Sequence, residues 1–130
     1  MKQNRPLSPH LTVYKPQLTA MLSIYHRITG SVLSLAIILL LFFSKVTSLQ
    51  LENYFLYNIG YLINSSGHWI VLSCLFAILF SLYYHFFNGI RHLIWDRAQL
   101  LEIQKVYQTG YIVLTLTVLS TITTWYILFF

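Results

Sequence analysis

The sequence predicts an all-α integral membrane protein with three transmembrane helices. Hydrophobic residues make up 57% of its 130 residues and only 8% are charged, whereas an ordinary soluble domain is about 25% charged. Three apolar stretches, at about 21–44, 69–90 and 106–130, are each long enough to cross a bilayer, which takes about 20 residues. We expect a single membrane-anchor domain over residues 1–130, with residues 1–20 as an arm on the inner side and no separate soluble domain.

The distribution of positive charge predicts an inside N-terminus and an outside C-terminus. Most lysines and arginines flank the first helix on its N-terminal side or follow the second helix: Lys2, Arg5, Lys15, Arg27, Arg91, Arg97 and Lys105. Three crossings place these two regions on one side of the membrane, and Lys and Arg accumulate in the inner loops. Topology therefore explains the net charge of +5, and we expect membrane lipid but no nucleic acid as a partner.

The first helix is preceded by a polar, proline-containing arm and followed by a polar connector. The connector, 46–67, is rich in Tyr, Asn and Ser and contains Tyr54, Tyr57 and Tyr61. Aromatic residues of this kind favour the headgroup region, so we expect the connector to lie at the membrane interface.

Cysteine usage and the N-terminus limit the type of cofactor and the compartment. The single cysteine, Cys74, excludes an internal disulfide, an iron–sulfur cradle and covalent CxxCH attachment of haem. The stretch 1–14 has neither the apolar core of a signal peptide nor an Arg-rich import pattern. The sequence therefore favours a bacterial protein or one made inside the organelle in which it works.

His85 is the strongest candidate for a metal or cofactor ligand. Counting back from Arg91 at about 1.5 Å per residue places His85 roughly 9 Å inside a hydrocarbon layer about 30 Å thick. Small and polar residues share its helix face: Ala77, Ser81, Asn88, Gly89 and His92. They leave room for either a closely packed helix or a flat tetrapyrrole. The alternative is an interhelical hydrogen bond that only holds the bundle together.

A bis-nitrogen haem iron needs a second axial ligand, and only one histidine here is deep. Another subunit must then supply that ligand. Arg27 and Arg91, both on the inner side, are candidates to pair with haem propionates, because Arg matches carboxylates bidentately. The alternative for Arg91 is ordinary snorkelling to the interface. His92 is expected at the interface, where it can be hydrated.

Ser23 and Arg27 are four residues apart and share a helix face at the inner boundary. Gly30 and Ser34 continue this small, polar stripe, which predicts contact with protein and not with lipid. A hydroxyl and a cation in this place can bind and polarise the carbonyl oxygen of a lipid-soluble head group. The alternative is snorkelling of Arg27 with simple helix packing.

Two long motifs resemble a known family. The first combines RPLSPHLTVYKPQL, beginning at Arg5, with LSIYHRITG, beginning at Leu22, and the second is HFFNGIRHLIWD, from His85 to Asp96. Both are similar to the signatures of the large cytochrome b subunit of succinate dehydrogenase, the membrane anchor of respiratory complex II. The motifs contain rare residues at fixed positions, although 45–67 and the region beyond Val106 match in hydropathy only.

The resemblance implies roles for particular residues. His85 would be an axial ligand of haem b shared with the small anchor subunit, and Ser23 and Arg27 would help to bind ubiquinone beside the iron–sulfur subunit. His26 and Arg27 would lie near the haem propionates, and Asp96 would assist proton supply to the quinone. The flavoprotein subunit would oxidise succinate, so this chain would be a non-catalytic subunit that helps electrons pass from the dehydrogenase to the quinone. We expect the mitochondrial inner membrane, with the bacterial inner membrane as the alternative.

Two other functions are weighed against this one. The chain lacks a dinucleotide fingerprint and a cysteine cluster, so flavin and iron–sulfur centres must belong to partners. A purely structural anchor would bind neither haem nor quinone, and a haem spectrum that depends on His85 discriminates the two. A small transporter subunit would need acidic or broken segments at mid-membrane, and the sequence has none.

Overall fold

The computed structural model describes residues 13–48, 53–62 and 67–129, and all that follows concerns them. The fold consists of α1 (Leu18–Ser48), α2 (Asn53–Leu62), α3 (His68–Asp96) and α4 (Ile103–Phe129). Helices α1, α3 and α4 are long and apolar enough to cross a membrane. The prediction of an all-α fold with three membrane-crossing helices is therefore confirmed.

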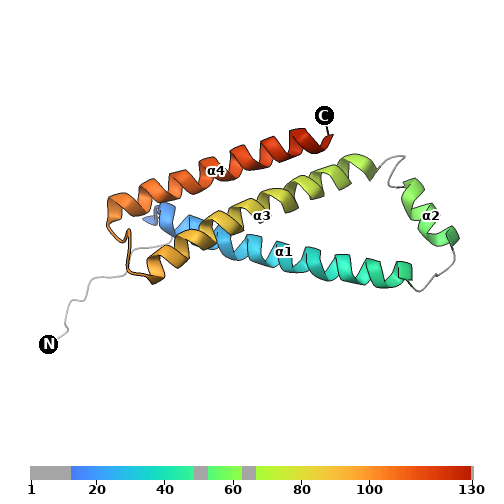
Figure 1. The fold of residues 1–130 in the computed structure, drawn as a ribbon, viewed down its shortest axis with the longest axis horizontal. Coiled ribbons are helices and arrows are strands. Elements are labelled where there is room, and N and C mark those ends of the chain that lie inside the picture. The colour runs from blue at the N-terminus through green and yellow to red at the C-terminus, as the bar shows by residue number, and fades with distance from the viewer. Residues whose placement is uncertain (1–12, 49–52, 63–66, 130) are drawn as a thin grey trace.

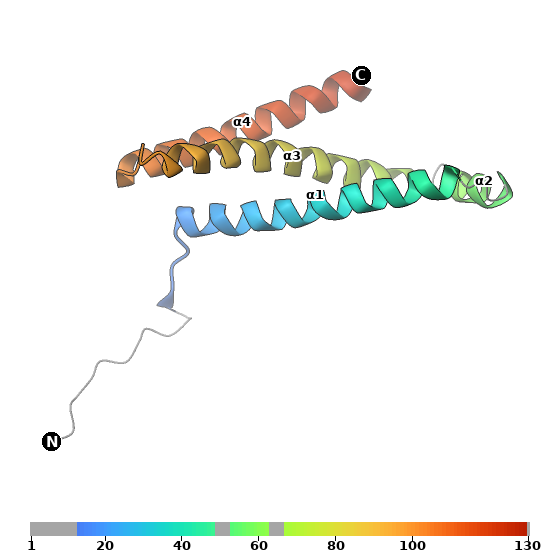
Figure 2. The same cartoon turned by 60° about the horizontal axis from the view of Figure 1, so that its bottom comes forward.

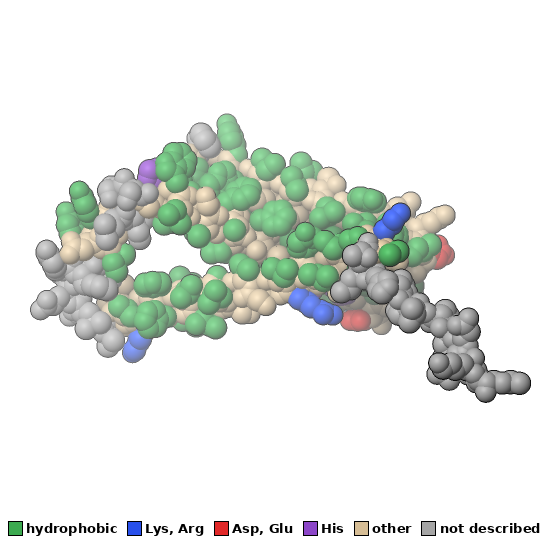
Figure 3. Space-filling model, turned by 180° about the vertical axis from the view of Figure 1, so that it is seen from behind, with side chains coloured by type: hydrophobic (Ala, Val, Ile, Leu, Met, Phe, Trp, Pro, Cys, Tyr) green, Lys and Arg blue, Asp and Glu red, His purple; other side chains and the backbone are tan. Residues whose placement is uncertain are grey.

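The three long helices run side by side, with α3 packed on both α1 and α4 (Figure 1). One end of the bundle is where α1 begins, α3 ends and α4 begins, and we call it the charged end. Most of the described charged residues belong to it: Lys15, Arg27, Arg91, Asp96, Arg97, Glu102 and Lys105. The surface between the two ends is mainly apolar (Figure 3), as expected for helices that face lipid or other membrane subunits.

The helices begin and end for local reasons. Pro16 cannot donate a backbone hydrogen bond, and helical bonding begins just after it, where the Met21 amide donates to the Gln17 carbonyl at 3.0 Å. The described residues before Leu18 lead away from the bundle (Figure 2). Between α3 and α4 the chain reverses within residues 97–102, where Ala98 and Leu100 take positive φ values of 56° and 58°. Such left-handed residues permit a short reversal at a modest energetic cost.

The helix lengths differ from the predicted apolar stretches. The three long helices contain 31, 29 and 27 residues, and α3 continues past Arg91 to Asp96. Arg91 therefore lies within the helix, and its guanidinium bonds inside the protein. The connector predicted between the first two crossings contains a ten-residue helix, α2, which sequence patterning missed. Within the described part of the chain, α2 packs on none of the other helices.

The packed core lies toward the charged end. Leu22, Tyr84 and Val113, one from each long helix, are 5% exposed or less. The Tyr84 hydroxyl donates to the Leu22 carbonyl at 2.8 Å, which ties α3 to α1. Toward α2 the helices α1 and α3 diverge (Figure 1), and the space-filling view shows the opening between them (Figure 3). The apolar residues 35–43 of α1 have exposed large side chains, which lipid or partner subunits must cover.

Candidate functional site

His85 lies against the start of α1, where three features of that helix contact its ring. The His85 Nδ1 is 3.2 Å from the carbonyl oxygen of His26 and 3.5 Å from the Thr29 Oγ1. The His85 and His26 rings are stacked, with centroids 4.0 Å apart and planes 4° from parallel. Gly30 faces the edge of the His85 ring. The predicted close helix neighbour of His85 is therefore α1.

The hydrogen bond to His26 fixes the tautomer of His85. A carbonyl oxygen only accepts, so the Nδ1 of His85 must carry the proton and donate it. The lone pair of the neutral ring then lies on Nε2. This nitrogen forms no hydrogen bond with the described residues and is not among their buried unpaired atoms, so it is open at the surface of the chain. A histidine with Nδ1–H bonded to a backbone carbonyl and a bare Nε2 is prepared to bind a metal.

His26 and His92 complete a group of three neighbouring rings. The centroid of His92 is 5.2 Å from that of His26, and His92 contacts Trp95 edge to face. The Nδ1 of His26 is buried and has no partner among the described residues. Nevertheless, no group of three or more His, Cys, Asp or Glu side chains in the described part of the chain is arranged to hold a metal ion.

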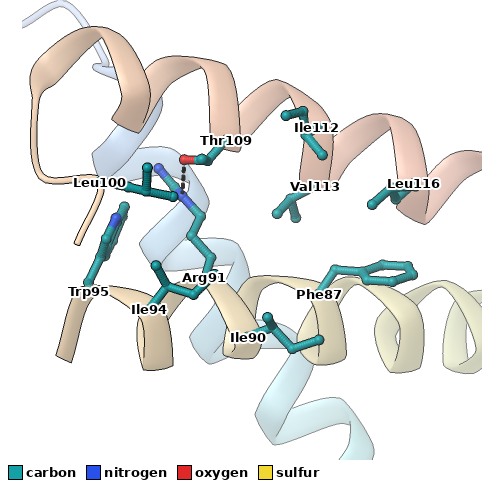
Figure 4. Close-up of a pocket in the computed structure, with 10 residues that line it drawn as sticks. All are labelled: Phe87, Ile90, Arg91, Ile94, Trp95, Leu100, Thr109, Ile112, Val113 and Leu116. Atoms are coloured by element: carbon teal, nitrogen blue, oxygen red, sulfur yellow. Dashed lines mark hydrogen bonds between the residues drawn. The ribbon is translucent and has the colours of Figure 1, made fainter. Parts of the chain in front are cut away.

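Arg91 occupies a different place from the one expected of a propionate partner or a snorkelling side chain. It is 4% exposed, and its guanidinium donates to Thr109 Oγ1 at 3.1 Å, Asn88 Oδ1 at 3.3 Å and the Val106 carbonyl at 2.8 Å. It also lies over the Trp95 ring at 4.1 Å. The contacts with Thr109 and Val106 direct Arg91 to α4 (Figure 4), whereas His85 contacts α1. The structure does not bring the two residues together.

The predicted polar stripe on α1 does not lie in a single environment. It consists of Ser23, Arg27, Gly30 and Ser34. Gly30 faces His85, whereas Arg27 and Ser34 are exposed and Ser23 is half-buried. The Ser34 hydroxyl donates to the Gly30 carbonyl of its own helix. Neither Ser23 nor Arg27 forms a side-chain hydrogen bond or ion pair with the described residues. Both groups remain available to a partner or ligand.

Asp96 and the arm complete the sequence-predicted site. Asp96 is exposed at the last position of α3 and forms no ion pair with the described residues. Residues 5–12 of the first motif lie outside the described residues.

An apolar groove of about 320 Å³ lies between α3 and α4. It is lined by Phe87, Ile90, Arg91, Ile94, Trp95, Leu100, Thr109, Ile112, Val113 and Leu116 (Figure 4). None of Ser23, His26, Arg27 and His85 lines this groove. The residues with open polar groups are thus separate from it.

Comparison with known proteins determines the family. Residues 1–124 match the family described as "Succinate dehydrogenase/Fumarate reductase transmembrane subunit". The chain belongs to this family. It is a multi-pass inner-membrane protein. Its relatives include proteins from mitochondria and from bacteria.

Individual relatives align along almost the whole chain. The "Succinate dehydrogenase cytochrome b560 subunit" of Reclinomonas americana is 45% identical over 127 residues, covering 98% of this chain and 88% of that protein. The mitochondrial cytochrome b560 subunit of Homo sapiens is 42% identical and aligns with 90% of this chain and 68% of its own length. The cytochrome b556 subunit of Rickettsia bellii is 38% identical, with 93% and 90% covered. The predicted resemblance to large cytochrome b subunits is confirmed.

Sequence reasoning missed part of the surroundings of His85. It did not single out Thr29, and it assigned Gly30 to the Ser23 stripe and not to the His85 contact. The available signal was the presence of small residues at Gly30 on α1 and Gly89 on α3, because small residues mark places where membrane helices approach closely. Which turn of α1 meets His85 depends on helix rotation, and periodicity does not give it.

Proposed function

We propose that this chain is the membrane-anchor subunit of a succinate:ubiquinone oxidoreductase and that it binds haem b and ubiquinone together with its partners. The small anchor subunit, the iron–sulfur subunit and the flavoprotein subunit would complete the complex. Family membership and the cytochrome b names of the relatives support this proposal. Oxidation of succinate belongs to the flavoprotein, and electrons reach the quinone beside the membrane anchor.

The state of the His85 ring carries the haem proposal. Its Nδ1 proton is held by the His26 carbonyl, which leaves an open Nε2 to act as one axial ligand. The small anchor subunit would supply the other axial ligand, as the resemblance to large cytochrome b subunits implies. Haem b, when bound, supplies one-electron redox chemistry.

Residues at the beginning of α1 are proposed to hold the haem propionates. Arg27 is exposed and unpaired among the described residues, and His26 has a buried nitrogen without a partner there. A charge-assisted pair between Arg27 and a carboxylate fits this environment. Arg91 is left out of the propionate site, because three acceptors and the Trp95 ring already hold its guanidinium.

Ser23 and Arg27 are proposed to bind the ubiquinone carbonyl, and Asp96 to assist its protonation. One turn of α1 separates Ser23 from Arg27, and both lie at the charged end with no side-chain partner among the described residues. A hydroxyl and a guanidinium stabilise negative charge as it develops on the reduced quinone. Asp96 is exposed at the same end of the bundle and can exchange protons with water.

The charged end is proposed to face the matrix or cytoplasm, where the peripheral subunits dock. The excess of Lys and Arg at this end supports the assignment. The mitochondrial inner membrane is the proposed location, and the bacterial inner membrane is the alternative.

Substitution of two histidines on one helix face tests the haem proposal. In the assembled complex, His85→Ala should abolish or strongly reduce haem b, measured by the Soret band and the redox-difference spectrum. His92→Ala is the matched control and should retain a low-spin six-coordinate spectrum. Full haem content in His85→Ala would support the purely structural anchor, and loss of haem in His92→Ala alone would move the ligand to His92.

Separate assays of dye and quinone reduction test the quinone proposal. Ser23→Ala should lower turnover or raise the quinone KM by an amount equivalent to about 1 to 3 kcal/mol, the usual cost of an unpaired buried polar contact. Arg27→Leu should cost more, because it removes a charge as well as donors. Both variants should reduce an artificial dye that accepts electrons upstream of the quinone at the normal rate. Equal loss of both activities would restrict these residues to a role in assembly.

A further inference from the structure

We propose that Gly30 and the adjoining turn of α1 position the His85 imidazole for its ligand, and that Gly30 is the residue most specific to this task. The inference rests on the proposed role of His85 as a haem ligand. It adds a positioning residue on α1, a helix that supplies no iron ligand itself.

Gly30 is required by the closeness of the His85 ring. A Cβ atom placed on Gly30 would lie 3.0 Å from Cε1 of His85, 3.5 Å from Nδ1 and 3.9 Å from Nε2. The shortest of these is tighter than nearly all real Cβ contacts. Any side chain at position 30 would therefore push against the ring edge between the two nitrogens. This edge, the Cε1 atom, connects Nδ1, which donates to α1, with Nε2, which would bind iron.

The same turn of α1 also holds the ring by its polar edge. The Nδ1 proton of His85 is shared between the His26 carbonyl at 3.2 Å and Thr29 Oγ1 at 3.5 Å. The Thr29 hydroxyl uses its single proton on a carbonyl of its own helix, that of Tyr25 at 2.9 Å or His26 at 3.0 Å. Its oxygen is then an acceptor toward His85. Displacing the ring from Gly30 would lengthen the bond that fixes its tautomer.

A third contact restrains the plane of the ring. The His26 ring covers one face of His85 at a centroid distance of 4.0 Å and an interplanar angle of 4°. One turn of α1 therefore restrains the His85 ring in three ways. Gly30 lies at its edge, the His26 carbonyl and Thr29 hold its Nδ1, and the His26 ring covers its face. Outer contacts of this kind orient a metal-bound histidine and raise its basicity, and their loss typically costs 10- to 100-fold in metal affinity.

Two glycines provide a matched comparison for the experiment. Gly89 on α3 approaches His26, and a Cβ placed on it would lie 3.9 Å from His26 Cε1, an ordinary contact. Alanine favours a helix more than glycine does, so neither substitution weakens its helix. In assembled complexes, Gly30→Ala should release haem at least about fivefold faster than the unmodified protein and shift its low-spin electron paramagnetic resonance signal. Gly89→Ala should remain within about twofold and keep the signal.

Gly110→Ala controls for general disturbance of the bundle. Its Cβ would lie 2.8 Å from Leu22 Cδ1 on α1, and its three nearest atoms belong to Leu22, Leu18 and Arg91 and not to His85. This variant should lower the thermal stability of the complex while the haem signal of the assembled fraction stays unchanged. A shift of the signal in Gly110→Ala equal to that in Gly30→Ala would overturn the specific role of Gly30.

Substitutions at Thr29 test the polar contact without adding bulk at the ring edge. Thr29→Val removes the Oγ1 acceptor and keeps the shape of the side chain, so the Nδ1 proton is held less firmly and the haem midpoint potential should rise. Thr29→Ser keeps the hydroxyl and should restore the potential. If Gly30→Ala fails to assemble, the Thr29→Val and Thr29→Ser variants still test whether this turn of α1 positions the His85 ring.

The outcomes separate this inference from the proposed function. Retention of haem in His85→Ala would refute the haem assignment itself. Loss of haem in His85→Ala, together with identical haem release and signals in Gly30→Ala and Gly89→Ala, would overturn only the positioning role of Gly30.

Discussion

The two interfaces of α3 differ in whether an unpartnered polar atom is open at the surface of the chain. Toward α4, Arg91 bonds to Thr109 and to the Val106 carbonyl, and Tyr83 bonds to Thr124 at 2.7 Å. Around Arg91, Asn88 Nδ2 and Trp95 Nε1 have no partner among the described residues, but both atoms are buried. Toward α1, the Nε2 of His85 is open and Nδ1 of His26 lacks a partner among the described residues. The face of α3 toward α1 therefore presents an open nitrogen, whereas the polar atoms of the face toward α4 are enclosed within the chain.

The α3–α4 interface also satisfies its small polar residues locally. Thr117 and Thr121 are 0% and 1% exposed, and their hydroxyls donate to carbonyls one turn earlier in α4, at 2.8 Å and 2.7 Å. Such hydroxyls add no bond between helices, but their small size allows close packing. The comparison teaches that polarity inside this bundle does not by itself mark function. What distinguishes the candidate site is a histidine nitrogen, Nε2 of His85, that is open at the surface of the chain.

The largest expected effect comes from breaking the α3–α4 interface at Arg91. Arg91→Leu removes three hydrogen bonds and the contact with Trp95, and we expect a loss of about 2 to 4 kcal/mol in stability. Thermal denaturation of the complex in mild detergent measures this loss. The haem signal of the fraction that remains assembled should be unchanged, because His85 contacts α1.

Arg97→Leu is the matched control for Arg91. The Arg97 side chain is exposed and forms no ion pair with the described residues, so the change should stay within about 0.5 kcal/mol. If Arg91→Leu were as stable as the original chain, the cost of desolvating the guanidinium would equal the gain from its contacts.

A smaller effect is expected from the tyrosine hydroxyls that tie α3 to its two neighbours. Tyr84→Phe removes the bond to the Leu22 carbonyl at 2.8 Å and should cost about 1 kcal/mol, since Tyr84 is buried. Tyr83→Phe should cost less, because Thr124 can turn its hydroxyl to a carbonyl of its own helix. Thermal shifts of the two variants provide the measurement, and a larger loss for Tyr83→Phe would reverse the expected order.

The smallest effect is expected at Thr117. Thr117→Val keeps the volume and removes a hydroxyl that bonds only within α4, so stability should change by about 0.5 kcal/mol or less. Thr117→Leu adds bulk at a fully buried position and should cost about 1 to 3 kcal/mol by overpacking. Equal thermal shifts in the two variants would mean that packing at Thr117 is looser than its burial indicates.

Much of the fold could be predicted because membrane helices follow local rules. Long apolar runs must form helices in lipid, where backbone groups have no other partners, and this gave the three long helices. The lengths of α1 and α3 could not be predicted from hydropathy, because their ends continue into polar residues. Helix α2 was missed because its mixed sequence has no clear apolar period.

The candidate site was only partly predictable for a different reason. His85 could be identified from its depth in the membrane and from its helix face, because both can be read from the local sequence. The stacking of His26 on His85 depends on how α1 is rotated against α3. The contacts of Arg91 with α4 were not predicted, although its spacing of six residues from His85 places it on another face of the same helix.

The burial of Arg91 has a consequence for how the chain enters the bilayer. A guanidinium is costly in hydrocarbon when it has no acceptors, and its acceptors on Thr109 and Val106 belong to the following helix. Helix α3 alone would carry this charge into the lipid with Asn88 as its one acceptor among those seen here. The two helices and their short reversal at 97–102 should therefore insert together as a hairpin, and truncation before α4 should leave α3 poorly retained in the membrane.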